Sequence, residues 1–517
     1  MNPVKENAPL RAEEVGPSGS TQSHAERRWI ILLCVLAGLR VFLFSSAFPF
    51  FSNVDEYTHF DQVVKYSNGQ WPLGMDKFDK ESAVIICLCT SPEYMKKPSA
   101  FANNAFPPPT WTLPVDQRSY LVAKDAPQYL RTTSIESVQP PLYYMIAGVW
   151  YRIGKILGLG DSIFVLYWTR FINILAIMIL VWISYAFMRR FYPTNRFLTY
   201  AVPLLVGFIP QDLFYGITND VLSPILYSVA LYFLLDIYLS KEKSYLYYLV
   251  AGLSIACTML VKLFNAPILV VAMVIIGVRI RDDWRSKQLG STLGKTGVIV
   301  AGAFAPILAW VIRNYVVMGS PTAIGQFNDM AGWKPKSFIQ IWNHPIFTAH
   351  GIALFWNDLM ASFWRGEYYW HNARLAWHSM DLFYSISSLI LLLCAALWIF
   401  GSSDRNGSEN AVDRIAFLAL GAGVLMLIGA SLRYDFGTIW PGPNRTYPYY
   451  TNARLIYGAV IPFSILYLRG LEFILTRIRI KPLLPAALGL IVVGMTYSEV
   501  VMSLGVFASK YNWFHMW

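Results

Sequence analysis

Long apolar segments alternate with short polar ones along most of this chain. Eleven of the apolar segments contain about 20 residues, the length of helix that crosses the hydrocarbon core of a bilayer. They lie near residues 29–51, 164–188, 196–214, 221–240, 245–261, 264–280, 296–316, 382–401, 412–431, 453–471 and 482–504. The pattern therefore predicts an all-α polytopic membrane protein with about eleven transmembrane helices.

One further apolar segment, residues 140–158, could cross the membrane or lie in its interface. It begins with Pro140-Pro141-Leu142 and contains Arg152 and Lys155. If it does not cross, four groups of Lys and Arg all fall inside, and if it crosses, all four fall outside. These groups lie at residues 189–190, 241–243, 279–287 and 477–481. Because cytoplasmic loops are enriched in Lys and Arg, we predict that the segment lies in the interface, with the N-terminus inside and the C-terminus outside.

The polar stretches divide the chain into a short tail and one large membrane domain. Residues 1–27 are rich in Ser, Glu and Pro, which predicts a disordered cytoplasmic tail. Residues 28–517 form the membrane domain, with large outer loops at about 51–163 and 317–381. The chain has no repeat of 20–50 residues and no matching pair of broken helices, which argues against a transporter built from inverted repeats.

Composition and charge agree with this architecture. Hydrophobic residues make up 55% of the chain and charged residues 14%, whereas soluble proteins carry roughly a quarter charged residues. The net charge of +11 is explained by the cytoplasmic loops. No basic run stands alone in a soluble segment, so we do not expect nucleic-acid binding.

Two adjacent carboxylates, Asp55 and Glu56, follow the first span directly. The pattern to Tyr66 predicts a short helix, on which Asp55 and His59 are four residues apart and share a face. A partly desolvated carboxylate suits a general base, although acids also complement the dipole at a helix N-terminus. Neighbouring residues on a helix point about 100° apart, so we expect only one of the pair to act as the base.

Cations and a polar turn are predicted on the same side of the membrane as Asp55. Lys262, Arg313 and Arg454 lie at the outer ends of three distant spans. They either extend to lipid headgroups or bind an anion such as phosphate. The turn Gln211–Asp220, which ends in Thr218-Asn219-Asp220, also faces outward, and Asn219 or Asp220 could simply cap the helix that follows.

The second outer loop is rich in histidine and tryptophan. It contains four of the seven histidines, and its aromatic density predicts an interfacial helix at about 346–365. Such a helix could line a groove for a prenyl chain or stack on a sugar ring. No histidine spacing is diagnostic of a metal site. No cofactor is therefore required, and a divalent cation remains an open alternative.

The order of these motifs resembles the glycosyltransferase superfamily with a multi-span C-type fold. The similarity is greatest to protein O-mannosyltransferases and to the aminoarabinose transferases of bacterial lipid A. It rests on Val54–Phe60, Gln139–Tyr144, Arg170-Phe171, Thr218-Asn219-Asp220, Arg313-Asn314-Tyr315 and Asn452–Leu455, within about residues 29–475. The resemblance implies transfer of a sugar from a polyprenyl-phosphate donor, on the extracytoplasmic side of a membrane, generally with inversion.

The resemblance also implies roles for individual residues. Asp55 is the expected general base, and Glu56 would hold the loop or bind the acceptor. The donor phosphate would contact Arg313, Arg454 and Lys262. The residues expected to bind substrate are His59, Asp220, Asn219, Arg170 and Gln139. Many relatives carry His or Lys before the Pro-Pro pair, whereas this chain has Gln139, which removes one cation from the phosphate site.

Two rival functions use the same features. A transporter or flippase for an anionic lipid or glycan would also need outward cations and aromatic grooves, but it should carry its ionisable groups near mid-membrane. A scaffold of a polysaccharide assembly complex should tolerate loss of Asp55 and Glu56. We expect the enzyme, which would take a glycan, lipid or protein as acceptor and serve cell-envelope glycan assembly in a bacterial inner membrane.

Overall fold

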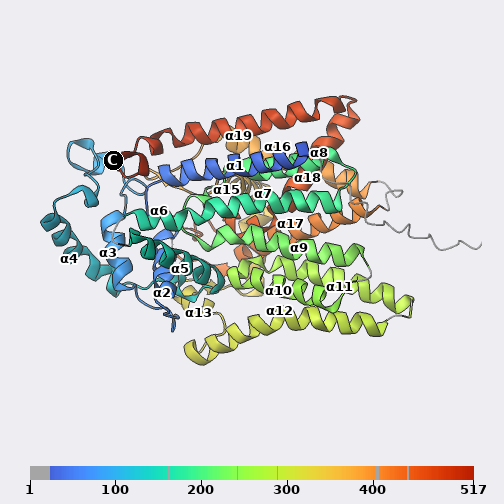
Figure 1. Ribbon diagram of the computed structural model, residues 1–517, viewed down its shortest axis with the longest axis horizontal. Helices are drawn as coiled ribbons and strands as arrows, with labels where there is room; N and C mark the ends of the chain where they lie inside the picture. The colour runs from blue at the N-terminus through green and yellow to red at the C-terminus, as the bar shows by residue number, and fades with distance from the viewer. Residues whose placement is uncertain are drawn as a thin grey trace, which may run out of the picture.

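The computed structural model describes residues 24–160, 163–240, 243–287, 289–401, 407–438 and 442–516. In these ranges the chain is a bundle of long helices with a layer of shorter helices at one end (Figure 1). Two pairs of two-residue strands lie in the connecting segments, β1 (Lys334–Pro335) with β4 (Tyr434–Asp435) and β2 (Tyr369–Trp370) with β3 (Ala373–Arg374), both antiparallel. The predicted all-α architecture is confirmed.

Among the described residues, nine helical segments are long and apolar enough to span a membrane. They are α1 (His24–Ala47), α6 with α7 (Phe164–Arg170 and Ile172–Phe191), η7 with α9 (Asn219–Leu222 and Ser223–Leu239), η8 with α11 (Leu263–Asn265 and Pro267–Arg285), α12 (Leu289–Met318), α16 (His378–Phe400), α17 (Ser408–Arg433), η10 with α18 (Ala453–Ala459 and Val460–Arg477), and η11 with α19 (Lys481–Leu483 and Leu484–Phe507). Two shorter apolar helices, α8 (Arg196–Phe208) and α10 (Tyr245–Val261), complete the eleven predicted segments.

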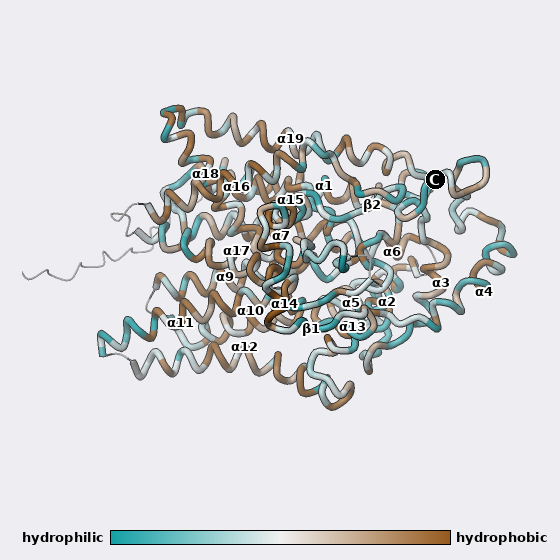
Figure 2. The backbone as a smooth tube through the Cα atoms, turned by 180° about the vertical axis from the view of Figure 1, so that it is seen from behind, coloured by the Kyte–Doolittle hydropathy of each residue, from teal (hydrophilic) through white to brown (hydrophobic). Residues whose placement is uncertain are grey.

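The remaining helices belong to the predicted outer loops. They are α2 (Glu56–Ser67), α3 (Lys80–Cys89), α4 (Val115–Arg131), η4 (Ile135–Val138), α5 (Leu142–Gly154), α13 (Ile324–Ala331), α14 (Phe338–Trp342) and α15 (Ala349–Arg365). Figure 1 shows α2 to α5 and α13 at one end of the bundle. Figure 2 shows mostly hydrophobic long helices and a more hydrophilic chain around α4 and α13. The polar loops thus form one cap over the apolar bundle.

The first helix begins earlier than the sequence predicted. Most of the predicted disordered tail, residues 1–27, lies outside the described residues, but α1 already begins at His24. Glu26 is buried there, and its carboxylate accepts a hydrogen bond from the Tyr185 hydroxyl at 2.8 Å and lies 3.2 Å from the Arg189 guanidinium. These partners on α7 stabilise the first turn, a tertiary effect that local composition does not report.

The Pro140 segment forms the 13-residue helix α5, which continues directly into η5 (Lys155–Leu159). Neither is among the described helices that are long and apolar enough to span a membrane. Helix α5 packs against α2, where a Cβ atom on Gly148 would come within 2.9 Å of the backbone nitrogen of Ser67. Trp150 stacks on Trp168 of α6, with ring centroids 4.3 Å apart. The helix is therefore part of the cap, as the charge distribution predicted.

Burial separates central from peripheral spans. In an apolar 18-residue stretch of the span that contains α18, 83% of the residues are buried inside the molecule. In the corresponding stretch of α12 the share is 22%. Figure 1 places α12 and α19 along opposite edges of the bundle. Apolar side chains of peripheral helices face outward where lipid would cover them. The central position of α18 brings Arg454, just before it, to the middle of the cap.

Candidate functional site

Asp55 lies at the junction between the turn after α1 and helix α2. It is the N-cap residue of α2, with φ of 59° in the left-handed region. Its carbonyl oxygen accepts the backbone N–H of His59 at 3.1 Å, while its side chain approaches Arg454. The predicted sharing of one helical face by Asp55 and His59 is wrong, because Asp55 precedes the helix and has a different backbone conformation.

Glu56 forms a sealed ion pair with Arg170. The Arg170 Nε and Nη2 atoms lie 2.7 and 2.8 Å from the two Glu56 carboxylate oxygens, and both side chains are at most 1% exposed. The carboxylate also accepts backbone N–H groups from Phe51, Ser52 and Ile217. The other Arg170 nitrogen contacts go to the carbonyl oxygens of Ser45, Phe48 and Pro49.

This pair changes two of the predicted roles. All five N–H donors of a guanidinium find partners in Arg170, so the prediction that Arg170 binds substrate is not supported by its geometry. Glu56 accepts five hydrogen bonds and is closed off from solvent. Of the roles considered for Glu56, the geometry favours holding the loop over catalysis.

Arg454 is the centre of a second, more open cluster. Its guanidinium lies 3.3 Å from Asp55, 3.5 Å from Asp220 and 3.5 Å from Glu367. Arg454 is 17% and Asp55 26% exposed, whereas the Asp220 side chain is fully buried. These distances exceed the roughly 2.7–2.9 Å of strong charge-assisted hydrogen bonds. Arg454 is therefore shared loosely among three carboxylates.

Lys262 joins the cluster through Asp220. It follows α10 directly in an extended conformation, and its ammonium group donates to one Asp220 oxygen and lies 3.5 Å from the Asn219 side-chain oxygen. Asn219 donates its amide to the Val261 carbonyl oxygen at 3.3 Å. The turn is capped by Thr218, whose hydroxyl accepts the Asp220 N–H at 3.3 Å. The Asp220 carboxylate accepts a hydrogen bond from the Thr218 hydroxyl at 3.2 Å and also faces the two cations.

His59 connects the cluster to a carboxyl group that the sequence did not single out. Its Nδ1 lies 2.8 Å from the Tyr144 hydroxyl, which donates to Glu136 at 3.3 Å, and its Nε2 lies 3.4 Å from the Thr218 hydroxyl. Burial, reinforced by the charge of Lys262, holds the pKa of His59 well below its usual value. The imidazole is therefore neutral near pH 7.

Glu136 is the group at the far end of this chain of contacts. Burial, followed by the negative charge of Asp55, raises the pKa of Glu136 to about 7. Glu136 lies in the 3-10 helix η4, within the long first loop, and belongs to no sequence motif. The only available signal was its position three residues before Gln139, which has its backbone N–H on the Glu136 carbonyl at 3.1 Å.

Glu367, the third carboxylate around Arg454, is positioned by the turn after α15. The Asp212 carboxylate accepts the backbone N–H groups of Glu367 and Tyr368 at 2.6 and 2.8 Å. Gly366 has φ of 92°, and a Cβ atom there would come within 2.0 Å of the Asp212 carboxylate. Burial, then the charge of Glu367, raises the pKa of Asp212 to about 7. The sequence placed Asp212 in the outward polar turn of residues 211–220, whereas it did not single out Glu367.

Arg313 lies apart from the contacts around Arg454. Its guanidinium donates to the Pro72 carbonyl oxygen and, at 3.2 Å, to the side chain of Asn314. Lys262 and Arg454 therefore converge as predicted, because both contact the Asp220 carboxylate. Arg313 instead contacts Pro72 and Asn314.

The interior of the cluster has little free space. A cavity of about 10 Å³ lies beside Arg454, lined also by Val54, Glu56 and Thr218. This is about the volume that one water molecule requires. A larger molecule does not fit in this cavity, whereas the Asp55 side chain is 26% exposed. Among the described residues, no group of three or more His, Cys, Asp or Glu side chains is arranged to hold a metal ion.

The arrangement combines an accessible carboxylate with two cations in a mostly buried setting. Asp55 can accept a proton at the solvent side, and Arg454 can contact an anion bound next to it. In the described cluster, Arg454 and Lys262 face the carboxylates of Asp55, Asp220 and Glu367. An incoming anion must therefore take over contacts that carboxylates now make with Arg454.

Comparisons with known proteins identify a family and several similar solved structures. Residues 39–439 match the family described as predicted membrane protein (DUF2142). No curated protein matches the chain in sequence. Crystal structures of the Archaeoglobus fulgidus oligosaccharyltransferase match at 12% identity with Zn and sulfate bound (TM-score 0.44, 93% of this chain and 53% of that one) and at 11% with a tethered acceptor peptide (0.46, 94% and 56%). ArnT from Cupriavidus metallidurans bound to undecaprenyl phosphate matches at 13% (0.31, 86% and 78%). This chain spans just over half the length of the oligosaccharyltransferase chains.

Proposed function

This chain belongs to the DUF2142 family of predicted membrane proteins, and we propose that it is a membrane glycosyltransferase. In this proposal a sugar moves from a polyprenyl-phosphate donor to a hydroxyl group of a glycan, lipid or protein acceptor, with inversion. The cap that contains α2 to α5 faces the outside of the membrane, because the opposite end carries the Lys- and Arg-rich turns. The donor's lipid tail lies in the bilayer and its phosphate reaches the cap.

One observation carries the proposal: Asp55 is the most exposed of the three carboxylates around Arg454. Its side chain is 26% exposed, against 16% for Glu367 and none for Asp220. An acceptor hydroxyl can reach Asp55 from solvent while the donor phosphate contacts Arg454, with the two groups on opposite faces of the anomeric carbon, as inversion requires. Base and phosphate-binding group are then close enough to act on one glycosyl bond.

The reaction is a single displacement at the anomeric carbon. An oxygen of the Asp55 carboxylate takes the proton from the acceptor hydroxyl, whose oxygen forms the new bond to the anomeric carbon. The bond between that carbon and the donor phosphate oxygen breaks, and its electron pair stays on the polyprenyl phosphate. Arg454 stabilises the negative charge that develops on this leaving group, and Lys262 keeps the Asp220 carboxylate compensated.

The contacts of Arg454 suit a group that changes partners. Its contacts with Asp55, Asp220 and Glu367 are 3.3–3.5 Å long, so a phosphate can replace one of them at low cost. The sealed Arg170 lacks this freedom. When the guanidinium moves toward the phosphate, its contact with Asp55 opens and the carboxylate becomes free for the acceptor hydroxyl, which couples donor binding to proton removal.

The test is sugar transfer from a labelled polyprenyl-phosphate sugar by the purified full chain. The donor is first identified as the lipid that accumulates in a deletion strain. Asn cannot accept the proton, so Asp55→Asn should lose turnover by at least about a hundredfold while donor binding persists. Asp435→Asn is the matched control, because Asp435 also pairs with an arginine at partial exposure.

The outcomes separate three explanations. Loss of turnover in Asp55→Asn alone supports the proposal. Normal turnover in Asp55→Asn together with a well-folded, inactive Glu56→Gln would transfer the base role to Glu56. If neither substitution changes transfer, the acid pair is structural, and movement of an anionic lipid or glycan becomes the function to measure in vesicles.

A further inference from the structure

A cavity lies at the end of the bundle opposite the Arg454 cluster. It has a volume of about 750 Å³, within the range of ligand pockets. Its walls come from α9, α10, α11 and α12. Helix α11 starts at Pro267, beside the Lys262 end, and runs to Arg285 at the other end, so the turn from α11 to α12 lies at the end away from the cap (Figure 1). This end is the predicted cytoplasmic one.

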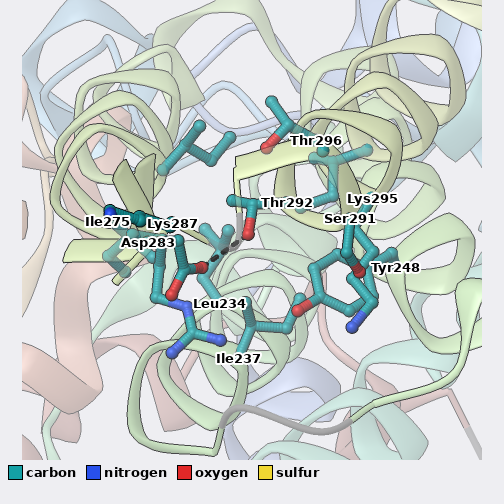
Figure 3. Close-up of a pocket in the computed structure, with 14 residues that line it drawn as sticks. Leu234, Ile237, Tyr248, Ile275, Asp283, Lys287, Ser291, Thr292, Lys295 and Thr296 are labelled. Atoms are coloured by element: carbon teal, nitrogen blue, oxygen red, sulfur yellow. Dashed lines mark hydrogen bonds between the residues drawn. The ribbon is translucent and has the colours of Figure 1, made fainter. Parts of the chain in front are cut away.

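The charged side chains around this cavity favour an anion. Arg279, Lys287 and Lys295 line it, against a single lining carboxylate, Asp283. Asp283 is buried and already accepts a hydrogen bond from the Thr292 hydroxyl at 2.5 Å, shown as a dashed line in Figure 3. The charged side chains that line the cavity are thus three cations and one carboxylate.

The first turns of α12 add neutral donors on the same side. Ser291, Thr292 and Thr296 carry hydroxyl groups into the lining, and Figure 3 shows Thr292 near the centre of the cavity with Thr296 beside it. Lys295 lies over the Tyr248 ring, with its ammonium 5.7 Å from the centroid. Hydroxyl groups and lysine ammonium groups together match the oxygens of a phosphate group.

The rest of the wall is aliphatic. Leu234 and Ile237 of α9, Ile275 and Ile276 of α11 and Ile299 of α12 form this apolar part of the lining. A small soluble anion gains nothing from such a wall, whereas an amphiphile can place its apolar chain there and its headgroup among the cations. Buried apolar surface stabilises such a complex by roughly 25 cal/mol per Å².

We propose that the cavity between α9, α10, α11 and α12 binds a phosphate-bearing anion, presented as the headgroup of an anionic lipid of the inner leaflet. The phosphate contacts Lys287, Lys295 and the hydroxyl groups of Ser291 and Thr296, and the lipid chain lies against the aliphatic wall. This site is separate from the proposed active site and does not depend on glycosyl transfer.

The experiment measures lipid binding to the purified full chain by native mass spectrometry. Phosphatidylglycerol is compared with phosphatidylcholine, and inorganic phosphate is titrated as a competitor in a separate arm. The test variant is Lys287→Gln with Lys295→Gln. The matched control is Arg281→Gln with Arg285→Gln, which removes two positive charges from the same end at residues outside the cavity lining.

Removal of each cation should weaken phosphatidylglycerol binding about fivefold, hence roughly 25-fold in the double variant. The control should stay close to the unchanged protein. If inorganic phosphate alone binds with the same dependence on Lys287 and Lys295 and displaces the lipid, the source is free phosphate rather than a headgroup. Equal losses in test and control variants, or no loss in the test variant, would overturn the site.

A second variant covers the case in which the double substitution does not fold. Gly290 lines the cavity, and a Cβ atom built there meets no atom within 4 Å. Gly290→Leu should therefore fold, fill part of the cavity without changing its charge, and reduce phosphatidylglycerol binding. Undiminished binding in a folded Gly290→Leu protein would place the anion outside the cavity and refute the proposal.

Discussion

Asp55 and Glu56 are neighbours in sequence, yet each faces a different arginine in a different environment. Glu56 meets Arg170 at 2.7 and 2.8 Å with both side chains at most 1% exposed. Asp55 meets Arg454 at 3.3 Å with 26% and 17% exposure. The first pair is closed by backbone groups on all sides, whereas the second shares its arginine with two further carboxylates.

The backbone produces this difference. Asp55 has a left-handed conformation just before α2, and Glu56 begins the helix. One carboxylate therefore turns toward α18 and the cap, and the other toward α6 inside the bundle. Two adjacent acids after a span can therefore have different roles: one carboxylate fixes the loop, and this loop positions the other.

The largest effect is expected from breaking the sealed pair. Arg170→Ala leaves the Glu56 carboxylate buried without its cation, which costs about 3–5 kcal/mol in the free energy of unfolding. Thermal or denaturant unfolding of the purified protein in detergent measures this loss. Arg445→Ala is the control, since its pair with Asp435 is exposed and should contribute at most about 1 kcal/mol. Equal losses in both variants would show that the sealed pair has no special role.

The open pair should respond in binding rather than in folding. Arg454→Ala leaves Asp220 with Lys262 and Asp55 facing solvent, so the protein should still fold and insert. Donor affinity should fall by about 2–5 kcal/mol, or roughly 30-fold to several thousandfold. Binding of the polyprenyl-phosphate sugar to the purified protein measures it. Unchanged affinity would assign Arg454 to holding the three carboxylates together.

The spans could be predicted from sequence, and most of the site could not. Each span is visible as about 20 consecutive apolar residues, and the loop charges placed the Pro140 segment in the cap, where α5 packs against α2. Glu136 and Glu367 lie in long loops without periodicity and join the site only through tertiary contacts. That Arg170 is closed off from substrate could not be predicted either, because most of its hydrogen-bond partners are carbonyl oxygens at the distant end of α1 and in the turn after it.

The negative charge of Asp55 acts on the buried Glu136 carboxyl group, so we expect the stability of the protein to depend on pH. The pKa of Glu136 rises from 4.5 to about 7 on folding, through burial and then the charge of Asp55. The folded state thus holds this proton more tightly, so stability is lost as pH rises from about 4.5 to about 7. Glu136→Gln cannot ionise and should be more stable than the unchanged protein near pH 8, by at most about 3 kcal/mol.

Unfolding temperatures near pH 5 and pH 8 test this coupling. The advantage of Glu136→Gln should be small near pH 5 and largest near pH 8. Asp55→Asn removes the nearby charge and should lower the pKa of Glu136, which reduces the pH dependence. An advantage that is independent of pH would mean that packing, rather than charge, explains the variant.

The smallest effect is expected at Arg313, whose hydrogen bonds go to neither Asp55 nor Glu56. Its guanidinium donates to the Pro72 carbonyl and to Asn314, and so fastens the segment between α2 and α3 to the end of α12. Neither contact is to a carboxylate, so Arg313→Ala leaves no buried charge behind. We expect donor affinity to change by at most about 1 kcal/mol, the scale of one ordinary hydrogen bond, well below the change for Arg454→Ala in the same binding assay. A loss as large as that of Arg454→Ala would show that the donor phosphate extends from the Arg454 cluster to α12, and that two arginines rather than one hold it.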